Sequence, residues 1–282
     1  MEIYSRIRCI VGVLLTAALA IFMMPASASA AEESFFSTLE FEAYAATAYF
    51  TWEEYDNGER LLEETGPLFG AGGKLRVPVT GRLAADFRGE VFGGRVDYDG
   101  QTWDGDPVTT DSDYVGVKLE ADLGWDLIAS EKTVFAPFAG LGARIWEREL
   151  RNTLYWDESE QETQVAVGYN EYWQSYYARL GFDASHAFSD RVSAFAAAAL
   201  KLPIDTENEV DLTDSLTLEL EPGNRYAAYA ELGASIGRLR VSLFYEGLRF
   251  SESDPEYGYN DLWFIQPESE SDIFGINAGW RF

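Results

Sequence analysis

From residue 31 onward, apolar and polar side chains alternate with a period of two in segment after segment. This is the period of a β-strand, in which successive side chains point to opposite faces of the sheet. We therefore predict ten strands: 38–52, 67–79, 82–98, 114–128, 133–150, 172–187, 190–203, 224–236, 239–251 and 271–282. The stretch from Val210 to Leu220 also alternates, so it either extends the flanking strands or adds a hairpin, which would give twelve strands.

The connections between these strands alternate in length. The short ones are Thr80-Gly81, Ala129 to Lys132, Phe188-Ser189 and Gly237-Arg238, and the long ones are 53–66, 99–113, 151–171, 204–223 and 252–270. An outer-membrane barrel has this rhythm, because its periplasmic turns are short and its extracellular loops are long. The sequence thus predicts an all-β fold: a single antiparallel up-and-down transmembrane β-barrel.

The two faces of each predicted strand differ in chemistry. In segment 114–128, Leu119 and Leu123 share the apolar face, while Glu120 lies on the opposite face. A soluble barrel would turn the apolar face inward and expose faces rich in glycine and ionisable residues. The signal-peptide pattern of the first residues and the pattern of the last strand favour the opposite arrangement, with the apolar face outside. Segment 82–98 changes phase near Gly93-Gly94, which predicts a β-bulge there.

Residues 1–30 have the pattern of a cleavable signal peptide. A basic start with Arg6 and Arg8 is followed by an apolar run and then by small residues suited to cleavage. We expect residues 31–282 to form the barrel. Cys9, the only cysteine, lies in the signal, so the predicted mature chain has neither a disulfide nor a cysteine-based metal site. The net charge of −27 argues against nucleic-acid binding.

The last segment carries a recognisable pattern. Trp280 and Phe282 are aromatic residues two positions apart at the end of the sequence. They resemble the C-terminal assembly signal of bacterial outer-membrane β-barrel proteins. Segment 135–144 is similar to strands of small porin-like and OmpA-type barrels. The resemblance implies an outer-membrane location, contact with membrane lipid and lipopolysaccharide, and insertion by the barrel-assembly machinery. The oligomeric state stays open.

Placing the polar faces inward predicts a lumen filled with paired charges, since an unpaired charge in a narrow lumen is costly. The predicted network consists of Lys74, Arg76, Asp86, Arg88, Glu90, Lys118, Glu120, Asp122, Arg144, Arg179, Asp183, Arg225, Glu231, Arg240, Glu246 and Arg281. Either these charges interlock and close the barrel, or they line an ion-selective pore. Several inward glycines, among them Gly142 and Gly233, leave a narrow water path open as an alternative.

The sequence offers little for catalysis. The omptin proteases resemble this chain in strand number and loop rhythm, but their chemistry needs a histidine beside carboxylates at the extracellular rim. Here the one histidine, His186, falls at the periplasmic edge of segment 172–187 and on its outward face. We therefore predict no enzymatic activity and no cofactor.

The loops hold most of the acid surplus, which is typical of a solvated acidic surface and makes calcium binding a weaker alternative. Aromatic residues stand among the acids: Trp103, Tyr155, Trp156, Tyr257, Tyr259 and Trp263. They either bind sugars or a partner, or pack between the loops. The sequence predicts a non-enzymatic outer-membrane barrel with an envelope-structural or surface-interaction role. The alternative is a small porin-like channel for ions or small solutes.

Overall fold

The computed structural model describes residues 39–102, 105–213, 216–258 and 262–282. The predicted signal peptide, 1–30, lies outside these ranges. No helix within them is long and apolar enough to cross a membrane. The described chain is dominated by long antiparallel strands, as the period-two pattern predicts.

Ten long strands close into a barrel, which confirms the predicted fold class and strand number. They are β1 (Glu40–Asp56), β2 (Glu59–Thr80), β3 (Leu83–Gln101), β4 (Pro107–Trp125), β6 (Thr133–Leu150), β9 (Asn170–Ala187), β10 (Val192–Thr213), β13 (Ala227–Ile236), β14 (Leu239–Ser253) and β17 (Glu268–Arg281). Each pairs antiparallel with the next, and β17 pairs with β1 to close the ring.

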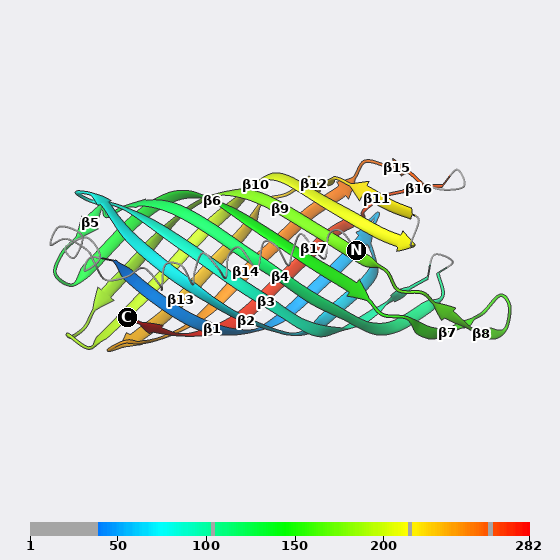
Figure 1. Cartoon of the computed structure of the whole chain (residues 1–282), viewed down its shortest axis with the longest axis horizontal. Helices are drawn as coiled ribbons and strands as arrows, with labels where there is room; N and C mark the ends of the chain where they lie inside the picture. Colours follow the sequence, from blue (N-terminus) through cyan, green and yellow to red (C-terminus); the bar gives the residue numbers. More distant parts are fainter. Residues whose placement is uncertain (1–38, 103–104, 214–215, 259–261) are drawn as a thin grey trace, which may run out of the picture. The chain divides into compact units, whose positions relative to one another are not determined.

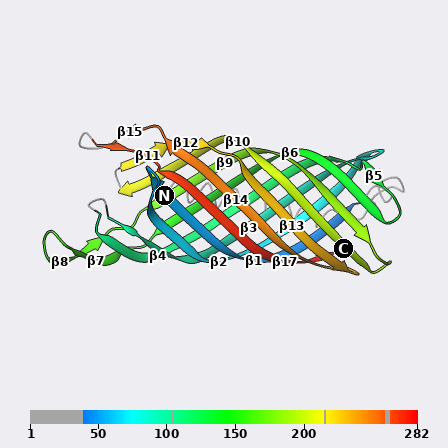
Figure 2. The same ribbon diagram turned by 180° about the vertical axis from the view of Figure 1, so that it is seen from behind.

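Shorter strands decorate the barrel. They are β5 (Ile128–Ala129), β7 (Thr153–Asp157), β8 (Glu162–Ala166), β11 (Leu216–Leu220), β12 (Pro222–Asn224), β15 (Glu256–Tyr257) and β16 (Trp263–Phe264). Strands β7 and β8 form a separate hairpin, as do β15 and β16. Figure 1 shows these two hairpins at one end of the barrel and the C-terminus with β5 at the other, and Figure 2 shows the same division from behind. We call these the loop end and the turn end.

Several segments predicted as loops are largely strand, among them 53–66, 99–113 and 204–223. In place of the predicted loop 53–66, β1 continues to Asp56 and β2 starts at Glu59. Asn57 and Gly58 make the turn with φ of 49° and 83°, values that suit the tight turn of a hairpin. The stretch from Val210 to Leu220 both extends β10 and forms β11, and β11 pairs only with β10 at the loop end. The barrel therefore keeps ten strands.

The predicted bulge at Gly93-Gly94 is wrong. Strand β3 keeps one register with β4 from Leu83 to Gln101. Val96 and Tyr98 simply face the barrel interior, where they are 1% and 7% exposed. The apparent change of phase arises because the interior itself changes from charged to apolar toward the loop end.

The outward faces form an apolar belt. Large apolar side chains on neighbouring strands stay exposed, among them Phe69, Val91, Leu123, Leu141 and Phe274. An exposed apolar surface this extensive is unfavourable in water and matches the lipid-facing band of a membrane barrel.

Candidate functional site

The barrel interior is the candidate site, and side chains from opposite walls meet in it at three levels. In the closed order of ten strands, β3 and β13 lie halfway round the ring from one another, as do β4 and β14, and β1 and β9. Each of these three pairs is joined by a side-chain contact across the interior. We call the three levels the turn-end layer, the middle layer and the aromatic layer.

Glu231 is the centre of the turn-end layer. Its carboxylate accepts hydrogen bonds from Arg88 on the opposite wall at 3.0 Å and from Lys74 at 3.1 Å. Ser242 and Tyr229 donate to the same carboxylate at 2.6 and 2.9 Å. The four donors to Glu231 lie on β2, β3, β13 and β14. Their hydrogen bonds to one carboxylate therefore hold these four strands together.

A cavity of about 450 Å³ lies beside this layer at the turn end. Glu231, Arg240, Asp122 and Asp183 are among the residues that line it. Its charges are only partly paired: Arg179 donates to Asp122 at 2.6 Å, whereas no ion pair within 4 Å reaches Asp183 among the described residues. This part of the interior is thus polar and has room for water.

Glu246 is the centre of the middle layer. Lys118, on the opposite wall, donates to it at 2.8 Å, Arg144 approaches within 3.3 Å, and Lys201 donates to its other oxygen. All four side chains are at most 5% exposed. One buried anion is surrounded by three buried cations, so the remaining positive charge must be balanced nearby. Glu90, 3.7 Å from Lys118, supplies part of that balance.

The aromatic layer fills the interior above the middle layer. Trp52 on β1 meets Trp173 on β9 edge to face at 5.1 Å, and Trp173 stacks on Trp146 at 5.3 Å with the ring planes only 8° apart. Phe250 closes the group at 5.2 Å from Trp173. None of the four is more than 3% exposed. Such packing excludes water, and each edge-to-face or stacked pair adds about 0.5–1.5 kcal/mol beyond the area that it buries.

A charged cluster is enclosed beside these rings. Arg148 bonds to three carboxylates, those of Glu54, Glu64 and Glu171, at 2.9 to 3.2 Å. The four side chains are between 0% and 8% exposed. We call these four residues the Arg148 cluster.

Most residues of the predicted charge network face the interior, but Arg225 does not. Arg225 is exposed outside the barrel, where it pairs with Glu268 and Glu270. The prediction was wrong because β13 begins only at Ala227, so the inward parity of the strand does not extend back to Arg225. Arg240 and Arg281 lie at the mouth of the turn end, within 3.6 and 3.8 Å of Glu42.

Arg76 and Asp86, two further members of the predicted charge network, lie near the same mouth. Arg76 donates to Asp86 at 2.9 Å and to Asp126 at 2.7 Å. Arg179 and Arg88 lie 2.9 and 3.7 Å from Glu120, so that Glu120 joins the turn-end cations of β9 and β3. Among the described residues, no ion pair within 4 Å joins these turn-end charges to Glu246 and its three cations.

The sequence interpretation missed Lys201 and the whole Arg148 cluster. Lys201 has the parity opposite to the outward Leu200, and this signal was available in the sequence. Glu54 and Glu64 were missed because they were assigned to a loop, where side-chain parity carries no information. Only the extension of β1 and β2 places them inside.

The inward glycines do not form an open file. A Cβ added at Gly142 would lie 2.3 Å from the ring of Tyr177, and one at Gly233 would lie 2.3 Å from the ring of Phe195. Interior aromatic rings therefore pack directly against the backbone of these glycines. The inward glycines, which left a narrow water path open as an alternative, thus give it no support in the structure.

His186 lies at the turn end of β9, on the outer face. Its Nδ1 is 2.8 Å from Thr133 Oγ1 and its ring contacts Phe188 at 5.0 Å. It is exposed, and it lies at the opposite end of the barrel from the carboxylates of the loop end.

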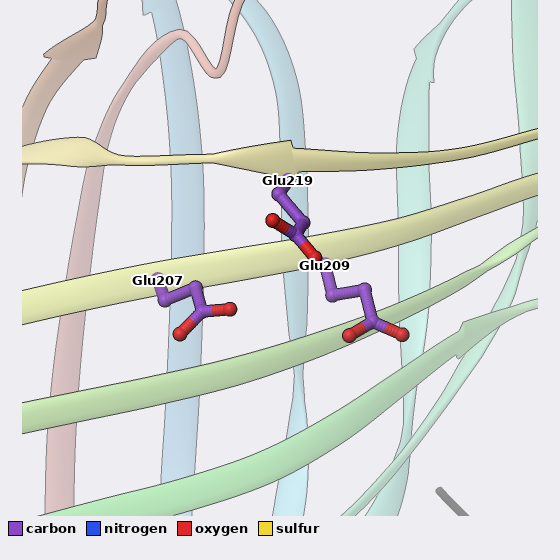
Figure 3. A group of neighbouring side chains, drawn as sticks. All are labelled: Glu207, Glu209 and Glu219. Carbon is purple, nitrogen blue, oxygen red and sulfur yellow. The ribbon is translucent and has the colours of Figure 1, made fainter. Parts of the chain in front are cut away.

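Three loop-end carboxylates come close together on the outer face of β10 and β11. Oxygens of Glu207, Glu209 and Glu219 lie within 4.8 Å of one another, and Figure 3 shows their side chains on the two paired strands. Oxygen ligands suit calcium, but three acids alone do not define a calcium site. Among the predicted loop aromatics, Trp156 and Trp263 are exposed, whereas Trp103 and Tyr259 lie outside the described residues.

Trp280 and Phe282 lie on the outer face of the closing strand. Trp280 is paired in register with Ala43 of β1 and Leu239 of β14. The Phe282 amide donates to the carbonyl of Phe41 at 3.0 Å, and the two rings are 5.5 Å apart.

A closed ten-stranded antiparallel barrel with an apolar exterior and a charged interior defines the class of outer-membrane β-barrel proteins. No protein-family model matches the chain, and no curated protein matches it. Among solved structures it is similar to the outer-membrane protease OmpT of Escherichia coli, with 11% identity, coverage of 86% of this chain and 96% of that chain, and a TM-score of 0.62. At this identity the likeness shows the fold alone.

Two further solved structures also match over most of their length. A FadL homologue of Pseudomonas aeruginosa shares 11% identity, with coverage of 86% and 90% and a TM-score of 0.32. The toluene transporter TbuX of Ralstonia pickettii shares 9%, with coverage of 86% and 89% and a TM-score of 0.38.

Proposed function

We propose that the protein is a non-enzymatic outer-membrane barrel whose interior is closed to solutes and whose loop end interacts at the cell surface. The observation that carries this proposal is the set of contacts between opposite walls. Lys118 with Glu246, and Trp52 with Trp173, join strands halfway round the ring. Barrels of about eight strands have interiors that side chains can fill, whereas open channels need more strands.

The exterior supports the orientation. The apolar belt faces lipid, the short turns lie in the periplasm, and the loop end projects from the cell. There the exposed Leu154 and Trp156 of the β7–β8 hairpin, together with Trp263, are available to sugars and acyl chains of lipopolysaccharide. Divalent cations would bridge the acidic loops to its phosphates.

The location of the one histidine supports a non-enzymatic role. The structurally similar OmpT is an outer-membrane protease. In this chain His186 is on the outer face at the turn end, so it is not available as a base for a loop-end carboxylate.

Conductance tests the closed interior. The mature chain, refolded into a planar lipid bilayer, should show no steady unitary current, while a porin inserted into the same membrane provides the positive control. Steady steps of current that scale with the amount of inserted barrel would overturn the proposal.

The alternative is a small channel, and the turn-end cavity of about 450 Å³ favours it. A channel would require the aromatic layer to move aside. Vesicles that carry the protein should then release a trapped small ion under osmotic or ionic gradients. If the ion leaks no faster than it does from protein-free vesicles, the channel alternative is excluded.

Surface interaction is tested by binding. Purified lipopolysaccharide should bind the folded barrel in the presence of a divalent cation, and binding should weaken several-fold when Trp156 and Leu154 are replaced by Ser. A matched control replaces the outward Leu141 of the apolar belt, which lies on the barrel wall. Equal binding by both variants would count against the hairpin as the contact surface.

A further inference from the structure

The Arg148 cluster contains more acid than base. Glu54, Glu64 and Glu171 come from β1, β2 and β9, and they surround the single guanidinium of Arg148 on β6. No other Lys or Arg of the described chain lies within 4 Å of these three carboxylates. With every carboxyl group ionised, the cluster would carry a formal charge of −2.

The three carboxylates differ in the number of hydrogen-bond donors that they receive. Glu64 receives Nε and Nη2 of Arg148 at 3.1 and 3.0 Å, the hydroxyl of Ser112 at 2.5 Å and the hydroxyl of Tyr114. Glu64 is thus well stabilised as the anion that neutralises Arg148. The surplus charge is left with the other two carboxyl groups.

Glu54 and Glu171 depend on one and the same nitrogen. Nη1 of Arg148 donates to both, at 3.2 and 2.9 Å. Each carboxyl group has one further donor, an indole N–H: Trp52 for Glu54 at 2.9 Å and Trp173 for Glu171 at 2.8 Å. Two such groups that share one site inside a protein are not both ionised without a large cost, and a proton removes that cost.

The other groups that face the cluster do not carry compensating charge. They are the neutral side chains of Ser112 and Tyr114 from β4, Tyr98 from β3, Tyr169 before β9, and Trp52 and Trp173. The nearest basic centre on the same strand is Arg144, which is bound to Glu246 and packs on Phe92 at 4.2 Å.

We propose that Glu54 and Glu171 form a proton-binding site that holds at least one proton at neutral pH and locks the aromatic layer in place. The link to the layer is direct, because the indoles that these two carboxyl groups hold are Trp52 and Trp173. Loss of the proton leaves two anions beside one guanidinium nitrogen and loosens the contact between β1 and β9. The locking role rests on the closed interior proposed above, whereas proton binding itself does not.

Infrared spectroscopy of the refolded barrel tests the proton directly. At neutral pH the wild type should show the carbonyl stretching band of a protonated carboxyl group, shifted in D₂O. The double variant Glu54→Gln/Glu171→Gln should lose that band, while Glu53→Gln, at the half-buried neighbouring position on the outer face, should keep it. A wild-type spectrum without the band, or an unchanged band in the double variant, would overturn the proposal.

Unfolding as a function of pH gives a second readout. A proton held in the folded state is released on unfolding once the pH exceeds the ordinary glutamate pKa of about 4.3. The unfolding equilibrium constant should then rise about tenfold per pH unit for each proton held, until the folded site itself deprotonates. The wild type should lose stability relative to the double variant as pH rises, and parallel curves would contradict the proposal.

The two proposals fail separately. Ionic current through the wild-type barrel would overturn the closed interior and leave the proton-binding site intact. A missing carboxyl band would remove the proton-binding site and leave the closed interior intact.

Discussion

At the scale of single residues, Glu246 is a buried anion whose ionised form depends on three buried cations. It is the anion shared by Lys118, Arg144 and Lys201, and all of these side chains are buried. Burying ions is costly, and the geometry here offsets that cost only while every partner is present.

Replacing Glu246 by Gln should therefore destabilise the barrel by about 3–5 kcal/mol, since three cations lose their common anion. Urea unfolding of the refolded protein, followed by tryptophan fluorescence, measures the change. Glu53→Gln is the control, because Glu53 is bound by the Tyr55 hydroxyl and by the exposed Arg60, and ion pairs of this kind contribute about 0–1 kcal/mol. Similar losses in the two variants would contradict this account of the middle layer.

A second prediction concerns the glycines beneath the interior rings. Gly142→Ala should cost about 1–3 kcal/mol, because the new Cβ would overlap the ring of Tyr177. Gly89→Ala provides the control in the same assay, since the nearest atom to its Cβ would be the flexible end of Leu119 at 3.5 Å. If Gly142→Ala is as stable as the control, the ring of Tyr177 does not lie where the structure places it.

At the scale of elements, the β7–β8 hairpin lies outside the barrel sheet, although its residues Tyr155 and Ala166 pack against the buried core. Its strands pair only with one another in the sheet pattern. The chain on either side is already close, because the Leu150 amide donates to the carbonyl of Tyr169 at 2.9 Å.

Deleting residues 153–166 and joining the ends with a short glycine linker should leave the barrel folded. The variant should keep the gel-mobility shift on heating that distinguishes folded from unfolded barrels. Its unfolding midpoint in urea should fall only slightly below that of the wild type, because the deletion removes the core contacts of Tyr155 and Ala166. Removal of β11, which continues the wall of β10, is the contrasting deletion and should lower that midpoint. A hairpin deletion that abolishes the folded band would show that β7–β8 contributes to the barrel.

At the scale of the whole molecule, closure depends on β17 pairing with both β14 and β1. Trp280 and Phe282 lie outward on this strand, so they contribute little to the packed interior. We expect their main role to be recognition during insertion.

Replacing Trp280 and Phe282 by Ala should therefore reduce the amount of protein in the outer membrane several-fold in cells. Refolding of the same variant from urea into detergent, without assembly machinery, should proceed nearly as well as for the wild type. Equal losses in cells and in detergent would instead assign these two rings a structural role.

Apart from the connection 53–66, which is a two-residue turn rather than a long loop, the sequence alone determined the fold class and the ten strands. These follow from local regularities: a period of two sets the faces of each strand, and turn residues mark where strands end. Most of the interior charges could also be predicted, because parity assigns a side chain to a face wherever the strand limits are known. Arg225 failed because it lies just outside β13, and Glu54 and Glu64 were missed because the strands run past the predicted limits.

Only the tertiary structure decided which interior side chains meet. Parity states that Trp52 and Trp173 both face inward, but their contact depends on the strand number, the tilt and the register around the ring. The same holds for Arg148 on β6, which meets Glu54 and Glu64 of the distant β1–β2 hairpin as well as Glu171 of the neighbouring β9. Pairing across a closed barrel is a property of the whole ring, and a local sequence pattern carries no information about it.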